Sequence, residues 1–357
     1  MMNRKDFYEY IKNNVLDYLP SAFEKADVEL REVVKNNDQY LMALDIQKEG
    51  ESICPTIYLN QLYDQYRQGK DLDTCVGDVA DLRIEYDVPG EIPDIHNLSD
   101  YEWAKSKLQI RICDPELNEE RLKNLVYTIH GDYAATYHVN LSDPEGNSAS
   151  LGVTQDVLEC WGVTKEQLHE DALAADKLRT PLLCNMADLM DEIILEKEVV
   201  NMLTESEYEV PGIWEIPMFC LTNGERMYGA ALILQDDLLE QIGSIIRSDY
   251  YILPSSRHEV MLLPANDTMQ LSEMTSMVRE INETQVEPED RLSDKIQYYS
   301  REDYVLENAE KREKRQKMEK KEPSKKGIKS RMAETKKEAA LSAASNNHRH
   351  KSKEAVL

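Results

Sequence analysis

Charge and aromatic side chains divide this chain of 357 residues at one point, close to Tyr304. Residues 1–304 contain 26 Lys and Arg against 60 Asp and Glu, whereas residues 305–357 contain 16 against 8. All 25 Phe, Tyr and Trp residues lie in the first part. Because a core forms by burying apolar and aromatic surface, only the acidic part is expected to close one. The basic part is predicted to lie outside it.

The charge of each part limits the partners that we expect. Residues 1–304 carry a net charge of −34, and an acidic surface repels nucleic-acid phosphates and anionic lipid headgroups. Residues 305–357 carry +8, so contact with nucleic acid is expected only through this tail. The sequence therefore favours a protein partner, and no membrane partner is predicted.

Nothing in the sequence predicts a membrane span or an exported protein. No apolar run approaches the roughly 20 residues that a spanning helix needs. Residues 1–20 have the pattern of a charged amphipathic helix, not that of a signal peptide. The six cysteines are widely spaced and form no C-x-x-C pair, so we expect reduced, buried thiols. These features predict a soluble, cytoplasmic protein.

The spacing of apolar and turn residues predicts an α+β fold in which helices cover antiparallel hairpins. One hairpin is expected at 28–35 and 40–47, around Asn36-Asn37-Asp38, whose residue types tolerate left-handed backbone. A second is expected at 216–221 and 227–234, because Asn223-Gly224 suits a type I′ turn. Apolar periodicity and capping patterns predict the remaining elements: strands at 125–130, 133–141, 149–153 and 258–263, and helices at 164–178, 187–203 and 270–284.

These elements are expected to form four segments. The first is an N-terminal α+β subdomain at 1–180, and the second is a C-terminal α+β subdomain at 181–300. Residues 301–322 are predicted to be a solvated charged helix, because Glu and Lys recur four residues apart along it. Residues 323–357 are rich in Lys, Ser, Ala and Asn and are expected to be a disordered basic tail.

Cofactor motifs are absent from the sequence. Neither G-x-G-x-x-G nor G-x-x-x-x-G-K-[ST] occurs, so no nucleotide cofactor held by such a loop is expected, and no cofactor of any kind is predicted. His130 and His138 flank Asp132 on neighbouring predicted strands, which leaves a metal site open. The alternative is that both histidines face solvent, and no metal ligand is predicted.

One polar segment between two apolar runs is the candidate functional segment. It consists of Ser255, Ser256, Arg257, His258 and Glu259. A serine, a histidine and a carboxylate close together could serve nucleophilic or acid–base chemistry. However, His258 and Glu259 would point to opposite faces of a regular strand. The alternative is that the serines form a turn and that His258 or Glu259 ties the loop down. No catalytic residue is predicted.

Three stretches of the chain resemble a known family. They are Gly-Val-Thr-Gln-Asp-Val-Leu-Glu-Cys-Trp-Gly-Val at 152–163, Tyr-Gly-Ala-Ala at 228–231, and Ile-Leu-Pro-Ser-Ser-Arg-His-Glu-Val at 252–260. Together they resemble an uncharacterised family of bacterial proteins that share a domain of unknown function, over residues 2–293. The Leu-Pro-Ser-Ser-x-His-Glu block is its most distinctive piece. The resemblance implies a bacterial protein and brings no activity, substrate or catalytic residue.

The sequence contains no recognisable set of catalytic residues, and its acidic and basic residues separate into two parts of the chain. These features predict a non-enzymatic interaction or regulatory protein. One alternative is a hydrolase-like activity at residues 255–259. A second is nucleic-acid contact through the basic tail.

Overall fold

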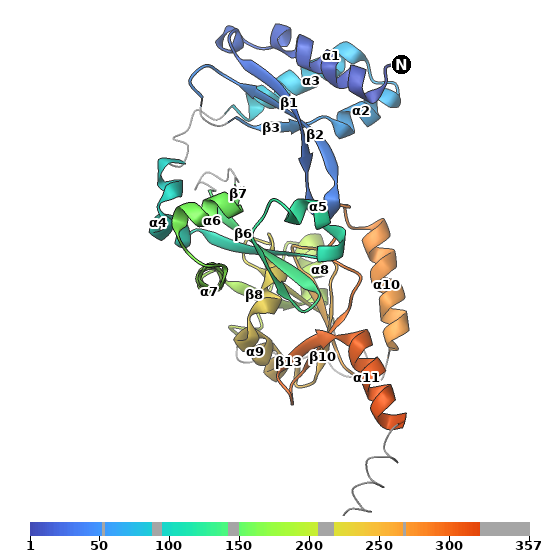
Figure 1. Cartoon of the computed structure of the whole chain (residues 1–357). Helices are drawn as coiled ribbons and strands as arrows, with labels where there is room; N and C mark the ends of the chain where they lie inside the picture. The colour runs from blue at the N-terminus through green and yellow to red at the C-terminus, as the bar shows by residue number, and fades with distance from the viewer. Residues whose placement is uncertain (52–53, 88–94, 142–149, 206–217, 267–268, 322–357) are drawn as a thin grey trace, which may run out of the picture. The chain divides into compact units, whose positions relative to one another are not determined.

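The computed structural model describes residues 1–51, 54–87, 95–141, 150–205, 218–266 and 269–321. Two compact units make up the chain, Met1–Leu306 and Glu307–Leu357. The fold is α+β, as predicted, with antiparallel sheets and covering helices (Figure 1). No helix of the described residues is long and apolar enough to cross a membrane.

The first sheet has the order β1-β2-β3 and contains the predicted first hairpin. β1 (Asp27–Val34) pairs with β2 (Tyr40–Gln47), and β3 (Thr56–Tyr58) pairs with the other edge of β2. The turn between them, η3 (Asn36–Asp38), has positive φ angles of 57° at Asn37 and 49° at Asp38. Asn and Asp tolerate this conformation better than other side chains, so the turn prediction is confirmed.

Helices cover one face of the first sheet and form a separate core with it. α1 (Arg4–Asn14), α2 (Asn60–Arg67) and α3 (Leu72–Glu85) contribute buried side chains to this cluster, together with apolar residues of β2 and β3. Three short 3₁₀ or turn-like helices join these elements or follow them: η1 (Val15–Tyr18), η2 (Ser21–Phe23) and η4 (Ile95–Ser99).

The second sheet is built around β6 (Tyr133–Asn140). β4 (Leu108–Cys113) pairs with one edge of β6, while β5 (Tyr127–His130) and β7 (Ser150–Gly152) pair in succession with the other. Alternation along the strands separates the two faces. Apolar side chains such as Ile110 and Tyr137 enter the core, whereas the opposite face carries Gln109, Arg111, Thr136 and His138.

The third sheet has the order β13-β12-β10-β11-β9-β8. One hydrophobic cluster takes side chains from the second and third sheets, such as Tyr137, Leu183 and Tyr250, from both sides of residue 180. The division of the chain into subdomains near residue 180 stays a prediction about independently folding units. The strands are β8 (Pro181–Asn185), β9 (Phe219–Asn223), β10 (Tyr250–Leu253), β11 (Val260–Pro264), β12 (Gln297–Ser300) and β13 (Val305–Asn308).

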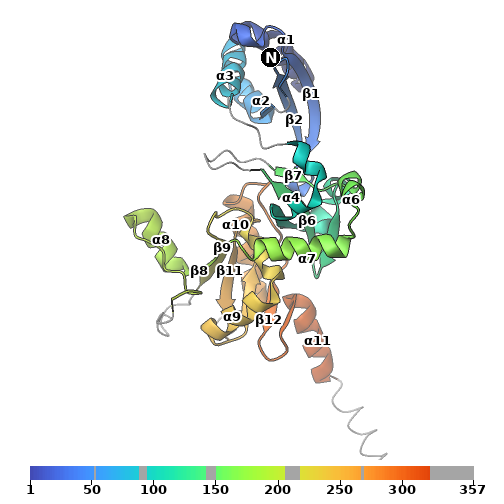
Figure 2. The same cartoon turned by 90° about the vertical axis from the view of Figure 1, so that its left-hand side faces the viewer.

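Helices surround these two sheets (Figures 1 and 2). α7 (Lys165–Asp176) packs on β4, and Thr164 caps it by accepting a hydrogen bond from the Gln167 N–H, as the sequence predicts. The remaining helices are α4 (Tyr101–Lys105), η5 (Pro115–Leu117), α5 (Glu119–Leu122), α6 (Gln155–Trp161), α8 (Met186–Leu195), η6 (Gly229–Leu234), α9 (Asp236–Ile246) and α10 (Leu271–Thr284).

The predicted hairpin at 216–221 and 227–234 is wrong. β9 pairs with β8 and β11, and the second predicted strand is the 3₁₀ helix η6. The Asn223 side chain accepts a hydrogen bond from the Met227 N–H (3.2 Å) and donates one to the Met227 carbonyl (2.8 Å), which folds the loop back on itself. Gly229 then packs so closely that an added Cβ would lie 2.7 Å from the His258 carbonyl oxygen. Residues 216 and 217 lie outside the described residues.

Two predicted helices have different limits. The helix expected at 187–203 ends at Leu195, because Glu196 adopts a positive φ of 53°. The charged helix expected from residue 301 is α11 (Ala309–Lys321), because β13 occupies the residues before it. The Glu313–Lys317 pair, at 2.7 Å, confirms the predicted spacing of opposite charges. The predicted disordered tail, residues 323–357, lies outside the described residues.

Candidate anion-binding site

A cavity of about 580 Å³ lies between the polar face of the second sheet and the first hairpin. Arg31 on β1, which pairs with Asp45, lines it together with three arginines from separate elements: Arg111 on β4, Arg121 on α5, and Arg257 in the loop between β10 and β11. We call this space the arginine cavity. Side chains from β1, β3, β6 and the loop before η6 complete its wall, among them Lys35, Tyr58, His138 and Tyr228.

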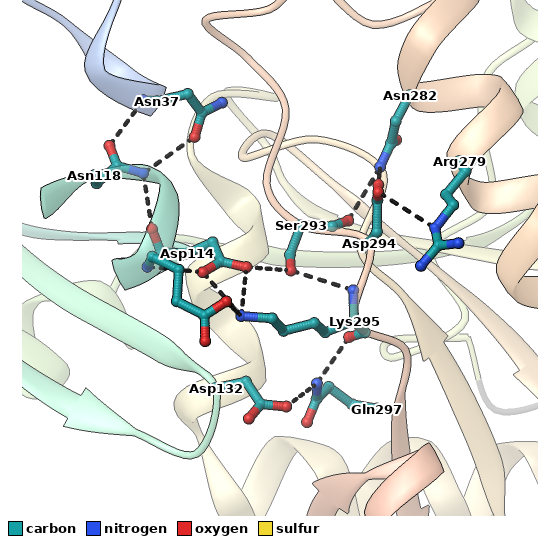
Figure 3. A network of polar contacts seen from close by, with 11 residues as sticks. Asn37, Asp114, Asn118, Asp132, Arg279, Asn282, Ser293, Asp294, Lys295 and Gln297 are labelled. Atoms are coloured by element: carbon teal, nitrogen blue, oxygen red, sulfur yellow. Dashed lines mark hydrogen bonds and ion pairs between the residues drawn. The ribbon is translucent and has the colours of Figure 1, made fainter.

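The tip of the first hairpin is fastened beside this cavity by hydrogen bonds. The Asn37 N–H donates to Asn118 Oδ1 (2.8 Å), and Asn118 Nδ2 donates to Asn37 Oδ1 (3.0 Å; Figure 3). The Asp38 carboxylate accepts from the N–H groups of Glu120 and Arg121, each at 2.9 Å. These N–H groups open α5 and have no partner within the helix, so Asp38 caps it. The hairpin thereby fixes the backbone that carries Arg121.

A second polar network, drawn in Figure 3, fixes the segment before α5. The buried Asp114 carboxylate accepts from Ser293 Oγ (2.7 Å) and from Lys295 Nζ (3.0 Å). Lys295 Nζ also contacts Glu116 at 2.8 Å. The buried charge of Asp114 is therefore paired, as is usual for charged groups inside proteins.

Arg257 is the one arginine of the three whose partner is an acid. Its Nε donates to Asp290 Oδ1 (2.8 Å), and the same oxygen accepts from His258 Nε2 (3.1 Å). The hydrogen bond from His258 and the positive charge of Arg257 hold the pKa of Asp290 below its usual range. His258 Nδ1 accepts from the N–H of Tyr228, whose φ is 58°. His258 thus connects Asp290 to the loop that carries the Tyr228 ring.

Arg111 and Arg121 have no carboxylate within ion-pair distance among the described residues. The Arg111 guanidinium lies over the Tyr228 ring, 3.7 Å from its centroid, and its Nη2 donates to Gln109 Oε1 at 3.1 Å. Burial lowers the pKa of Arg111 to about 10, and repulsion from Arg257 and Arg121 adds to this effect. Burial likewise lowers the pKa of Arg121. Within the described residues, the two guanidinium groups thus lie in a largely buried space and form no ion pair, although Glu32 and Glu289 also line the cavity.

His138 lies in the wall of the cavity with only 5% of its surface exposed. Burial, with repulsion from Arg111, Arg121 and Arg257, holds its pKa well below the usual value, so the ring is neutral at pH 7. Its Nε2 lies 3.2 Å from Thr136 Oγ1. The prediction that strand histidines face solvent is wrong for His138, because the hairpin and α5 cover this face of the sheet.

The five predicted candidate residues occupy different environments, and Arg257 is the one that lines the cavity. Ser256 Oγ donates to Glu259 Oε1 (2.7 Å) and accepts from the His258 N–H (3.0 Å), which closes a tight turn. Ser255 donates its N–H to the Leu253 carbonyl at 3.0 Å. Both nitrogens of the His258 ring bond to other groups, so the structure brings no serine hydroxyl to that ring within the described residues.

Sequence reasoning missed Arg111, Arg121 and the role of His138. Gln109 and Arg111 alternate with apolar residues in the strand Leu-Gln-Ile-Arg-Ile-Cys at 108–113, and its partner strand carries His138 and Thr136 in matching register. Polar residues that recur on one face of two paired strands indicate a polar site on that face, and this pattern is visible in the sequence. Arg121 gave no signal, since it lies in a short charged helix that resembles solvated surface.

The described residues contain no group of three or more His, Cys, Asp or Glu side chains that could hold a metal ion. His130 stacks on His169, with ring centroids 4.4 Å apart, and its ring is not part of the cavity that His138 lines. The cysteines of the described residues are unbridged, and four are buried: Cys75, Cys113, Cys184 and Cys220.

Comparison with known proteins gives one match. A family model described as "Family of unknown function (DUF5688)" matches residues 4–301. This range includes every arginine of the cavity and all five candidate residues. No curated protein and no solved structure matches the chain.

Proposed function

This chain belongs to the DUF5688 family of unknown function, and from the geometry of its arginine cavity we propose that it is a non-enzymatic protein that binds a small anionic ligand. The family match itself carries no activity, so the proposal depends on the site.

The absence of a counter-charge for Arg111 and Arg121 among the described residues carries the proposal. A guanidinium group removed from water without a partner destabilises the fold, and a bound anion removes that cost. Its planar set of N–H donors matches the two oxygens of a carboxylate or phosphate. Residues 1–304 carry a net charge of −34, so acidic side chains to pair with these arginines are abundant. That none of the described acidic residues pairs with Arg111 or Arg121 supports a ligand site over a purely structural role.

The contacts of residues 255–259 support the non-enzymatic reading. The Ser256 hydroxyl donates a hydrogen bond to Glu259, and the His258 ring joins Asp290 to the Tyr228 backbone through hydrogen bonds. These bonds hold Arg257 and Tyr228 in the cavity wall, which is a positioning role. A hydrolase would need a serine hydroxyl that a substrate can reach, whereas Ser256 is 5% exposed and does not line the arginine cavity.

Titration with inorganic phosphate tests the proposal. Calorimetry of the wild-type protein, at ionic strength balanced with sodium chloride, is expected to show saturable binding. Arg111→Gln and Arg121→Gln should each weaken it at least tenfold, because each removes one charged hydrogen-bonding group. The matched control is Arg226→Gln, an exposed arginine that pairs with Glu192 outside the cavity and should leave the affinity unchanged. Equal loss in all three variants, or heat that depends only on ionic strength, would contradict the proposal.

The cellular setting and the partner are further parts of the proposal. The unbridged cysteines, most of them in the core, support a cytoplasmic protein, because thiols stay reduced there. Fractionation of cells that produce the protein tests this location, and recovery outside the cytoplasm would refute it. A protein partner that responds to the bound ligand stays a prediction, based on the acidic surface. Pull-downs with and without phosphate test it, and identical sets of captured proteins would count against it.

A further inference from the structure

The hydrogen-bond state of His138 restricts what the ligand of the arginine cavity can be. Thr136 Oγ1 lies 3.0 Å from the Arg111 carbonyl oxygen and 3.2 Å from His138 Nε2. A carbonyl oxygen can only accept, so the hydroxyl proton of Thr136 goes to Arg111. His138 Nε2 must then carry the ring proton and donate it to Thr136. In a neutral ring this leaves Nδ1 as an acceptor.

Nδ1 of His138 has no hydrogen-bond partner among the described residues. The ring is 95% buried and belongs to the cavity wall. On the side of Nδ1 the neighbouring strand has Gly152, whose ideal Cβ would lie 3.7 Å from this nitrogen and 2.7 Å from Leu125 Cδ2. A larger residue at 152 would therefore clash with Leu125 and contact the His138 ring. This nitrogen does not belong to the fully buried polar atoms without a partner, so it is open to the cavity, where it can accept a hydrogen bond from a donor of the ligand.

The charges of the cavity restrict the anionic part of the ligand. Asp290 neutralises Arg257, whereas Arg111 and Arg121 form no ion pair among the described residues, although Glu32 and Glu289 also line the cavity. Two unpaired guanidinium groups match a group with two negative charges, which among common biological anions describes a phosphate monoester better than a single carboxylate or a phosphate diester.

The other residues of the cavity wall favour a ligand whose carbon part carries hydroxyl groups over one whose carbon part is a plain hydrocarbon. Asn36, Asn124 and Ser150 line the cavity, and the carboxylates of Glu32 and Glu289 lie at it as further acceptors. The volume of about 580 Å³ lies within the range of small-molecule sites, about 300–1,000 Å³. The space therefore suits a compact polar molecule larger than phosphate alone.

We propose that the ligand is a small phosphate monoester whose carbon body carries hydroxyl groups, with the phosphate held by Arg111 and Arg121 and a hydroxyl donating to His138 Nδ1. This rests on the proposed function, because it assigns the ligand class of the same cavity. His138 acts here as a specificity residue.

A matched pair of probes tests this assignment. Glycerol 3-phosphate and n-propyl phosphate have the same carbon number and phosphate, and only the first carries hydroxyl groups. The wild-type protein should bind glycerol 3-phosphate about five- to tenfold more tightly, the increment of one hydrogen bond to a buried group. His138→Gln retains a donor for Thr136 and has no acceptor at the Nδ1 position. It should bind n-propyl phosphate as the wild type does and lose the preference.

A second measurement needs no variant. In wild-type protein labelled with ¹⁵N-histidine, the His138 ring should show a protonated Nε2 and an unprotonated Nδ1, the tautomer that His258 also has, and glycerol 3-phosphate should shift the Nδ1 signal of His138 while n-propyl phosphate does not. Equal affinity for the two probes in the wild type, or a preference retained in His138→Gln, overturns the ligand class and leaves the anion site standing. If neither probe nor inorganic phosphate binds, the proposed function itself fails.

Discussion

Arg111 is the residue at which stability and binding are expected to oppose each other. Its guanidinium gains a contact with the Tyr228 ring and a hydrogen bond to Gln109, yet it lies near two other guanidinium groups and pairs with no carboxylate of the described residues. A structural arginine would show the opposite pattern, since removing it would leave a carboxylate unpaired. Substitution therefore distinguishes the two roles.

We predict that Arg111→Met changes the free energy of unfolding of the ligand-free protein by no more than about 1 kcal/mol, because lost stacking on Tyr228 is offset by relief of charge repulsion. Stabilisation by phosphate should disappear in the same variant. Urea unfolding with and without phosphate measures both quantities. A loss of several kcal/mol without phosphate would show that Arg111 is a structural residue.

Substitution of Asp290, unlike that of Arg111, should lower the free energy of unfolding at pH 7. Asp290→Asn removes the carboxylate shared by Arg257 and His258, and we expect a loss of about 1–3 kcal/mol in the free energy of unfolding. The pKa of Asp290 is lowered in the folded state, so its contribution is present above the unfolded value of about 3.9 and is lost as pH falls through the lower folded value.

The measurement is urea unfolding of the wild type and of Asp290→Asn at pH 7, 5 and 3.5. The difference between them should be constant down to about pH 5 and should shrink towards pH 3.5 and below. Asp191→Asn is the control, since Asp191 forms an exposed pair with Lys197 and should matter by less than about 0.5 kcal/mol. A difference that grows as pH falls would disagree with the assigned role of Asp290.

At the scale of elements, turn and capping residues correctly predicted the elements whose ends depend on neighbours in the sequence. Asn36-Asn37-Asp38 predicted the turn of the first hairpin, and Thr164 with Gln167 predicted the start of α7. The hairpin after β9 failed although Asn223-Gly224 is a strong turn signal, because Asn223 bonds to Met227 and Gly229 packs against His258. The second contact involves the loop before β11, which is distant in the sequence from the turn. The cavity was unpredictable for the same reason, since its arginines lie on β4, α5 and the loop before β11.

The cap from the hairpin tip to α5 gives a prediction at this scale. Asp38→Ala removes the acceptor for the first N–H groups of α5, which should cost about 0.5–2 kcal/mol of stability and displace Arg121. Phosphate affinity should therefore fall as well. Asp100→Ala is a matched control, since Asp100 caps α4 and does not line the cavity. Calorimetry would contradict the account if both variants bound phosphate equally well.

At the scale of the whole molecule, the first compact unit contains everything that the account needs. Met1–Leu306 holds both hydrophobic clusters and every residue that lines the arginine cavity. The divided charge of the sequence located the end of this unit to within a few residues of Tyr304. It did so because burying aromatic and apolar side chains is what makes a unit compact.

A chain that ends at Asn308 is therefore expected to fold and to bind phosphate with the affinity of the full chain. It retains β13 and lacks α11 and the basic tail. Calorimetry on the two proteins measures this, and circular dichroism checks the fold. Loss of phosphate binding in the shorter chain would place the anion site in the second unit. Binding of nucleic acid by the full chain alone would support the separate prediction for the tail.

A crystal structure with tungstate, an anomalously scattering mimic of phosphate, tests the central claim most directly. Arg111 and Arg121 form no ion pair among the described residues, and we propose that a bound anion pairs with both. We predict anomalous density in the arginine cavity, with tungstate oxygens about 3 Å from both guanidinium groups. Density confined to other surfaces, or Arg111 and Arg121 each paired with a carboxylate of the protein, would contradict it.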